Sequence, residues 1–247
     1  MKKDGFTLVE MALVIAIIGL VVGGIVAGQT MVHQAELRDV YARAHKYMVA
    51  AQGFQDKYGA MPGDFINASG YWSGAVNGNG DGVITMTGSA NTAGENFQFW
   101  NHMALAGLIE GIYTGNSGPN GGRDSRPGTN VPKGKIATSG YGLENEGVIS
   151  GGTNTWFWDS NLTIEMVFGG VIPTGNEPSD GPVLTPEEAY AIDSKFDDGR
   201  PGYGSIITYR PAGLWSNCVT SNTQTVAAYN LSYALGAACA ITFPDFM

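Results

Sequence analysis

Basic residues, histidine and cysteine are scarce in this 247-residue chain, and each shortage argues against a class of function. Thirteen Lys and Arg stand against 22 Asp and Glu, which gives a formal net charge of −9. Nucleic-acid binding by phosphate neutralisation needs clusters of Lys and Arg, and the sequence has no basic patch. The histidines His33, His45 and His102 lack metal-ligand spacing, and neither a nucleophile elbow nor a dinucleotide fingerprint is present. We therefore expect that the protein has no enzymatic activity, binds no nucleic acid and requires no cofactor.

Long apolar runs are also few, and the one that stands out lies near the N-terminus. From Phe6 to Val32 the single charged residue is Glu10. Residues 11–28 would form a helix of about 27 Å, which is long enough to cross a hydrocarbon core. A carboxylate in lipid costs roughly 2.5 to 3.5 kcal/mol on insertion scales and usually has a function. Glu10 either snorkels to the membrane surface or pairs with a charge on another molecule.

The residues before this run are not ordered as in a cleavable secretory signal, because the small residue Gly5 precedes the apolar run instead of following it. The segment Lys2 to Glu10, KKDGFTLVE, resembles the prepilin leader of the type IV pilin and pseudopilin superfamily. The resemblance implies that a prepilin peptidase cuts after Gly5 and that the new terminal amine of Phe6 is methylated. It also implies that Glu10 helps subunits to dock.

The same resemblance implies a structural subunit of a type IV pilus or a secretion pseudopilus. Residues 1–5 would be the cleaved leader, 6–32 the transmembrane and assembly half of a spine helix, and 33–247 a periplasmic or extracellular globular domain. The implied partners are the prepilin peptidase, other pilin or pseudopilin subunits and an inner-membrane assembly platform. The protein would span the inner membrane once before it enters a fibre that can reach the cell surface.

Two questions about this function stay open at the level of sequence. The globular domain is larger than a repeating subunit requires, which favours a minor component, but pilus and pseudopilus are not distinguished. The alternative function is a membrane-tethered adhesin or ligand-binding module that uses a pilin-like anchor. Such a module would work with Glu10 replaced, whereas a fibre subunit would not.

Helical periodicity continues beyond the apolar run. From Leu37 to Tyr58, apolar residues recur at alternating steps of three and four and trace one stripe. A single helix is therefore predicted from about residue 6 to 58. The fold class is α+β and pilin-like, a long N-terminal spine helix packed on an antiparallel β-sheet domain with long Gly-rich loops. We further expect a helix from the capping box Thr92-x-x-Glu95, a strand over 162–168, a helix opened by Thr185-Pro186, and strands over 205–209 and 237–243.

Two cysteines, Cys218 and Cys239, are the whole cysteine content of the chain. Lys2 and Lys3 precede the membrane segment, so the positive-inside rule places the following domain outside the cytoplasm. Because that compartment is oxidising, we predict that the two cysteines form a disulfide. The alternative is a pair of buried free thiols.

The motif Asn77-x-Asn79-x-Asp81 has the alternation of oxygen donors found in calcium loops. Its first position is Asn, and its twelfth position supplies no carboxylate, so Asp64 or Glu95 would have to complete the shell. The alternative is a tight Asn/Gly turn without a metal, and the ligand count favours it. Ca²⁺ is thus an optional ligand in this interpretation.

Two further groups have both a functional and a structural interpretation. Helical spacing places Asp193 and Asp197 on one side, as an acid–base pair would need, but an Asp-Asp-Gly helix end explains the same residues and is favoured. The aromatic residues Tyr71, Trp72 and 156–158 lie in Gly-rich surroundings. They could form a binding patch, although core packing is the commoner fate of such side chains.

Overall fold

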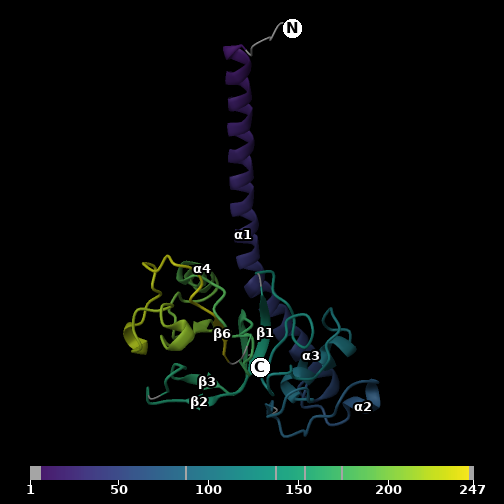
Figure 1. Cartoon of the computed structure of the whole chain (residues 1–247). Coiled ribbons are helices and arrows are strands. Elements are labelled where there is room, and N and C mark those ends of the chain that lie inside the picture. The colour runs from purple at the N-terminus through teal and green to yellow at the C-terminus, as the bar shows by residue number, and fades with distance from the viewer. Residues whose placement is uncertain (1–6, 87, 137, 153, 174, 245–247) are drawn as a thin grey trace.

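A single long helix runs from one end of the molecule into its body. The computed structural model describes residues 7–86, 88–136, 138–152, 154–173 and 175–244. Helix α1 extends over 51 residues, Leu8–Tyr58. Gly59 ends it in the left-handed conformation, with φ of 71°, and donates its amide to the Gln55 carbonyl at 2.8 Å. The predicted single helix is confirmed, and Figure 1 shows it standing out of the globular body.

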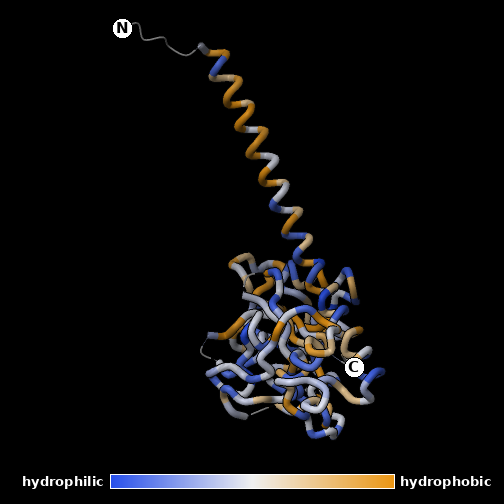
Figure 2. Tube along the Cα trace, turned by 90° about the vertical axis from the view of Figure 1, so that its right-hand side faces the viewer, coloured by the Kyte–Doolittle hydropathy of each residue, from blue (hydrophilic) through white to orange (hydrophobic). Residues whose placement is uncertain are grey.

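The surroundings of α1 change near Ala35. Every residue from Leu8 to Ala35 is exposed, whereas Leu37, Val40 and the apolar stripe that follows are buried. Figure 2 shows the first half as a mostly hydrophobic rod outside the body. The second half is the column against which the other elements pack. Its buried residues are Leu37, Val40, Ala44, Tyr47, Ala50, Ala51 and Phe54.

An antiparallel four-stranded sheet with the order β1-β4-β6-β5 forms the centre of the body. A second, two-stranded antiparallel sheet lies beside it. The long helix, the antiparallel sheet and the loops that join them agree with the predicted α+β class. The strands are β1 Ser139–Glu144, β2 Gly147–Ile149, β3 Ser160–Leu162, β4 Glu165–Gly170, β5 Ile207–Thr208 and β6 Ile241–Phe243. The helices after α1 are α2 Ala68–Tyr71, α3 Glu95–Leu105, α4 Pro186–Phe196 and the short 3₁₀ turns η1 Gly213–Trp215 and η2 Gln224–Val226.

The two faces of the large sheet differ in chemistry. Side chains alternate between faces along a strand, so Tyr141 and Phe168 lie on the face toward α1, and the Tyr141 hydroxyl donates to the Val40 carbonyl at 3.1 Å. The other face carries Glu144 and Glu165, which lie directly opposite each other in the β1–β4 register. Both are buried, and burial raises the pKa of Glu165 to about 8.

The expected strand over 162–168 is wrong, because the chain there belongs to two sheets. Strand β3 ends at Leu162, and Asn161 Oδ1 accepts the Thr163 amide at 3.2 Å in a turn that interrupts the run. Strand β4 begins at Glu165 and is buried along its whole length. A strand covered on both faces has no alternating burial, so the apparent alternation in the sequence was misleading.

The predicted start of α3 is wrong as well. The helix begins at Glu95 with Gly94 as its N-cap and no side-chain capping bond. The Thr92 hydroxyl instead donates to the Ser89 carbonyl at 2.7 Å, and Ala93 forms a β-bridge with Asn116. The chain is therefore extended where the capping box was expected.

Helix α4 starts as predicted. The Thr185 hydroxyl accepts the Glu188 amide at 3.2 Å, and the Glu188 carboxylate accepts the Thr185 amide at 2.8 Å, which completes a capping box. The other end of α4 packs on α1, where Phe196 stacks on Tyr41 with ring centroids 4.2 Å apart.

Strands β5 and β6 are shorter than the sequence indicated. Before β6, the chain is held by Cys239, which exchanges backbone hydrogen bonds with Leu184 at 2.9 and 3.0 Å. Cys239 also forms the predicted disulfide with Cys218, 21 residues away, and both are fully buried. The disulfide thus ties the C-terminal segment to Cys218, and the backbone bonds with Leu184 tie it to the chain that enters α4.

We expect Cys218→Ser and Cys239→Ser each to lower the free energy of unfolding by about 2 to 5 kcal/mol, because each change opens the same loop. Denaturant unfolding of the full chain in detergent micelles measures the loss. Ser216→Ala, an exposed neighbour, is the control and should change little. Labelling of two free thiols in denatured, unreduced protein would contradict the prediction.

Candidate functional site

The N-terminal end of α1 is closed by a capping box. Thr7 is the N-cap, and its hydroxyl accepts the Glu10 amide at 3.3 Å. Glu10 Oε2 in turn accepts the Thr7 amide and the Thr7 hydroxyl, both at 2.8 Å. This partner within the chain was not predicted, although Thr7-x-x-Glu10 is a capping signal that can be read from the sequence. Within the chain, Glu10 stabilises the helix start.

The half of α1 beyond this cap has no apolar partner in the described part of the chain. Fifteen large apolar side chains between Leu8 and Val32 are exposed, far more than a soluble monomer presents in one patch. The 28 residues from Leu8 to Ala35 give a rod of roughly 42 Å, longer than a hydrocarbon core of about 30 Å. This is the one described helix long and apolar enough to span a membrane.

Four glycines lie along this rod, and a Cβ added at any of Gly19, Gly23, Gly24 or Gly28 would meet nothing within 4 Å. No part of the described chain packs on them. Glycines in such helices let neighbouring backbones approach closely, so packing at these positions requires another molecule.

The sequence of residues 1–26 matches the family model of the prokaryotic N-terminal methylation motif. The chain carries a type IV pilin-like prepilin segment. The matched range contains Glu10 and the predicted cut between Gly5 and Phe6, two residues that lie outside those that the structure describes. The motif supports a pilin-like or pseudopilin-like subunit that is processed by a prepilin peptidase and associates with other pilin subunits. No curated protein and no solved structure matches this chain.

The three residues of the calcium-like motif lie on one loop, where their oxygens accept hydrogen bonds from the main chain. Asn77 Oδ1 accepts the Ser69 amide at 2.8 Å. Asn79 Oδ1 accepts the Asp81 amide and Asp81 Oδ1 the Val83 amide, each at 2.9 Å. These are Asx turns, which stabilise an Asn/Gly loop without a metal.

The two carboxylates named as completing ligands, Asp64 and Glu95, do reach this loop. They accept its backbone amides. Asp64 is 3% exposed and accepts the amides of Gly80 at 2.6 Å and Gly82 at 2.9 Å. Glu95 accepts those of Asn79 and Thr85, both at 2.8 Å. A calcium ion needs six to eight oxygens, so it would have to share these carboxylates with the amides. Calcium binding stays a prediction.

His102 also stabilises this region, a role that was not predicted from the sequence. Its Nδ1 accepts the Gly63 amide at 3.0 Å, and its Nε2 lies 2.9 Å from the Val76 carbonyl. Burial lowers the His102 pKa to about 4, so the ring is neutral and holds two loops together. A long-range contact of this kind leaves no signal in the local sequence.

The acidic group at the end of α4 has a structural arrangement. The carboxylates of Asp193, Asp197 and Asp198 lie within 4.8 Å of one another, and each accepts a backbone amide of the following turn at 2.8 or 2.9 Å. Asp193 also accepts the Tyr229 hydroxyl at 2.7 Å. Burial raises the Asp193 pKa to about 6. These bonds support the helix-end interpretation.

The aromatic residues proposed as one patch divide into two groups with different neighbours. Trp72 is half-buried beside the exposed Tyr71, and it packs on Phe54 of α1. Trp158 is buried, whereas Trp156 is 42% exposed and meets Trp215 edge to face. The sequence did not reveal Trp215 as a neighbour because it lies far along the chain.

We expect Asp64→Asn to lower the free energy of unfolding by about 1.5 to 3 kcal/mol in the presence of chelator, since a charge-assisted bond to an amide is lost. Asp81→Asn is the matched control. It keeps an acceptor oxygen on an exposed residue and should cost less. Thermal unfolding of the full chain in detergent measures both.

The same assay tests calcium. Because the first position of the motif is Asn and the twelfth supplies no carboxylate, we expect equal melting temperatures in saturating calcium and in chelator. A rise with free calcium that Asp81→Ala abolishes would instead establish the ion site.

Proposed function

We propose that this protein is a minor structural subunit of a type IV pilus or related pseudopilus, without enzymatic activity. The observation that carries the proposal is the coincidence of the matched methylation motif with an exposed apolar helix that follows it directly. The size of the globular domain supports a minor role, because a repeating subunit requires less.

The exposed half of α1 would serve two environments in turn. Before assembly it spans the inner membrane, with residues 33–247 in the periplasm. During assembly, a platform extracts the helix, and the fifteen exposed apolar side chains need an apolar environment in the fibre that replaces the lipid. Helices of neighbouring subunits supply this apolar environment, and the four glycines of the rod allow those helices to approach closely.

Glu10 would pair with the amine of Phe6 on a neighbouring subunit after the leader is removed. The capping box supports this role because it holds the carboxylate at the first turn of α1, four residues along the chain from Phe6. Both hydrogen bonds that the Glu10 carboxylate accepts from Thr7 end on the same oxygen, Oε2. A charge pair in lipid or in a dry fibre core offsets the cost of the lone carboxylate.

A second candidate is a membrane-tethered ligand-binding module that uses the pilin-like anchor. An aromatic and acidic cavity in the globular domain favours it. The two candidates differ in whether Glu10 matters for function.

Processing should produce a mature chain that begins at Phe6 and carries a methyl group on its amine, since the charged leader ends where the apolar run begins. Intact-mass measurement and N-terminal sequencing of membrane-extracted protein test this. A mature chain that begins at Met1, or one cut after Ala27, would show that the prepilin interpretation is wrong.

Three variants separate the charge of Glu10 from its capping role. Glu10→Gln keeps an oxygen for the Thr7 amide but removes the charge, and Glu10→Ala removes both. Thr7→Ala weakens the cap and keeps the charge. We expect both Glu10 variants to insert into the membrane but to enter fibres poorly, as measured by immunoblotting of sheared fibres. Thr7→Ala should assemble. Normal assembly of Glu10→Gln would refute charge pairing.

A further inference from the structure

A cavity of about 450 Å³ opens beside the sheet face that turns away from α1. Its apolar wall is aromatic. Trp215 stacks on Tyr209 with ring centroids 4.5 Å apart, and Trp156 meets Trp215 edge to face at 5.7 Å. Phe157 extends this wall. The volume lies in the range of small-molecule sites.

The charged part of the lining is mostly acidic. Four carboxylates, those of Glu144, Glu146, Glu177 and Asp180, face one guanidinium, that of Arg123, so the formal charge of the lining is −4 + 1 = −3. Arg123 contacts Glu144, and its Nη2 lies 3.3 Å from Glu146 and 3.8 Å from Glu177. A cavity of this charge repels anions and concentrates cations.

Asp180 is the carboxylate that Arg123 does not contact. It is 3% exposed, and its Oδ1 has no hydrogen-bond partner among the residues that the structure describes. Burial raises its pKa to about 7. A buried carboxylate oxygen without a hydrogen-bond partner lowers stability, so its presence in a cavity wall indicates a missing partner.

The fold holds Asp180 in this position. The Trp215 indole donates to the Asp180 carbonyl at 2.8 Å. The segment around Asp180 also lies against Gly169 of β4, where an added Cβ would come within 2.7 Å of the Ser179 and Gly181 carbonyl oxygens. The wall therefore depends on a backbone contact that glycine alone permits.

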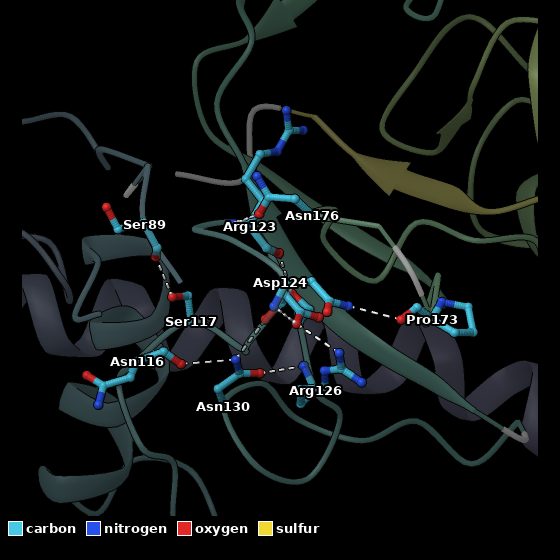
Figure 3. A network of polar contacts seen from close by, with 11 residues as sticks. Ser89, Asn116, Ser117, Arg123, Asp124, Arg126, Asn130, Pro173 and Asn176 are labelled. Atoms are coloured by element: carbon cyan, nitrogen blue, oxygen red, sulfur yellow. Dashed lines mark hydrogen bonds and ion pairs between the residues drawn. The ribbon is translucent and has the colours of Figure 1, made fainter. Parts of the chain in front are cut away.

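The loop that carries Arg123 is fixed by the network in Figure 3. The Arg123 amide donates to Asn176 Oδ1 at 2.7 Å, and Arg126 pairs with Asp124 at 2.8 Å. Asn130 donates to the Asp124 carbonyl at 3.0 Å. Arg123, which pairs with Glu144 and Glu146 of the lining, is thus held on an ordered loop.

We propose that this cavity binds a small organic cation, an alkylammonium or alkylguanidinium group, with Asp180 as the counter-ion and Trp156 and Trp215 as walls. Aromatic rings attract such cations through their faces and shield the alkyl chain from water. A hard metal ion fits less well, because Arg123 occupies three of the carboxylates and an ion needs six to eight oxygens. The inference does not depend on the proposed pilus role.

Calorimetric titration of the full chain in detergent micelles with agmatine tests the site, at about pH 8 so that Asp180 is ionised. We expect saturable binding, whereas the uncharged pentanol should not bind. Asp180→Asn should weaken agmatine binding by roughly tenfold or more, as loss of one partner of a buried charge pair does. Trp156→Leu should also weaken it. Glu187→Gln, which removes one exposed carboxylate outside the cavity lining, is the matched control and should bind normally.

The stability of the free protein supplies an independent readout. The folded-state pKa of Asp180 lies above its ordinary value, so its ionisation makes folding less favourable as pH rises toward about 7. Asp180→Asn should therefore raise the melting temperature, and by more at about pH 8 than at about pH 5, while it weakens binding.

Absence of agmatine binding, equal binding by Asp180→Asn, or equal binding of pentanol would overturn the proposal. N-acetylarginine amide that binds as tightly as agmatine would support it and identify a polypeptide side chain as the source of the cation.

Discussion

Helix α1 has an exposed apolar half and a half that is buried in the body, and the rest of the structure depends on how the buried half is held. Tyr141 of β1 donates to its backbone, Tyr47 meets Trp100 of α3 edge to face, and Phe196 of α4 stacks on Tyr41. Three elements from distant parts of the chain thus pack on one helical stripe. Because the helix is continuous, this packing also fixes the direction in which the apolar half leaves the body (Figures 1 and 2).

The Gly-rich loops are ordered by buried or half-buried polar side chains that accept backbone amides. Asp64, Glu95 and His102 each bind amides of loops remote in sequence. A loop with little regular structure must satisfy its backbone groups in this way. Acidic residues beside a loop can therefore resemble metal ligands in the sequence while they act as acceptors in the fold.

The acidic cavity represents the opposite case, in which a polar group is buried and left without a partner. Glu144 is paired with Arg123 and Tyr209, whereas Asp180 Oδ1 has no such bond within the described ranges. Such a group lowers stability, and functional sites commonly combine lower stability with activity.

The sequence alone determined the features that depend on local signals or on the compartment. The 3.6-residue periodicity predicted α1 to Tyr58, and the capping box predicted α4. The N-terminal residues predicted the prepilin segment and, through the compartment that they imply, the disulfide between Cys218 and Cys239. Tertiary structure decided what depends on contacts between distant segments. It divided 162–168 between two sheets, replaced the Thr92 cap by a bridge to Asn116, and placed Glu144 opposite Glu165. It also turned Asp64 and Glu95 toward backbone amides and buried Asp180 in the wall of a cavity. The physical reason is that the partner of each of these groups lies many residues away, so that neither spacing nor composition could reveal it.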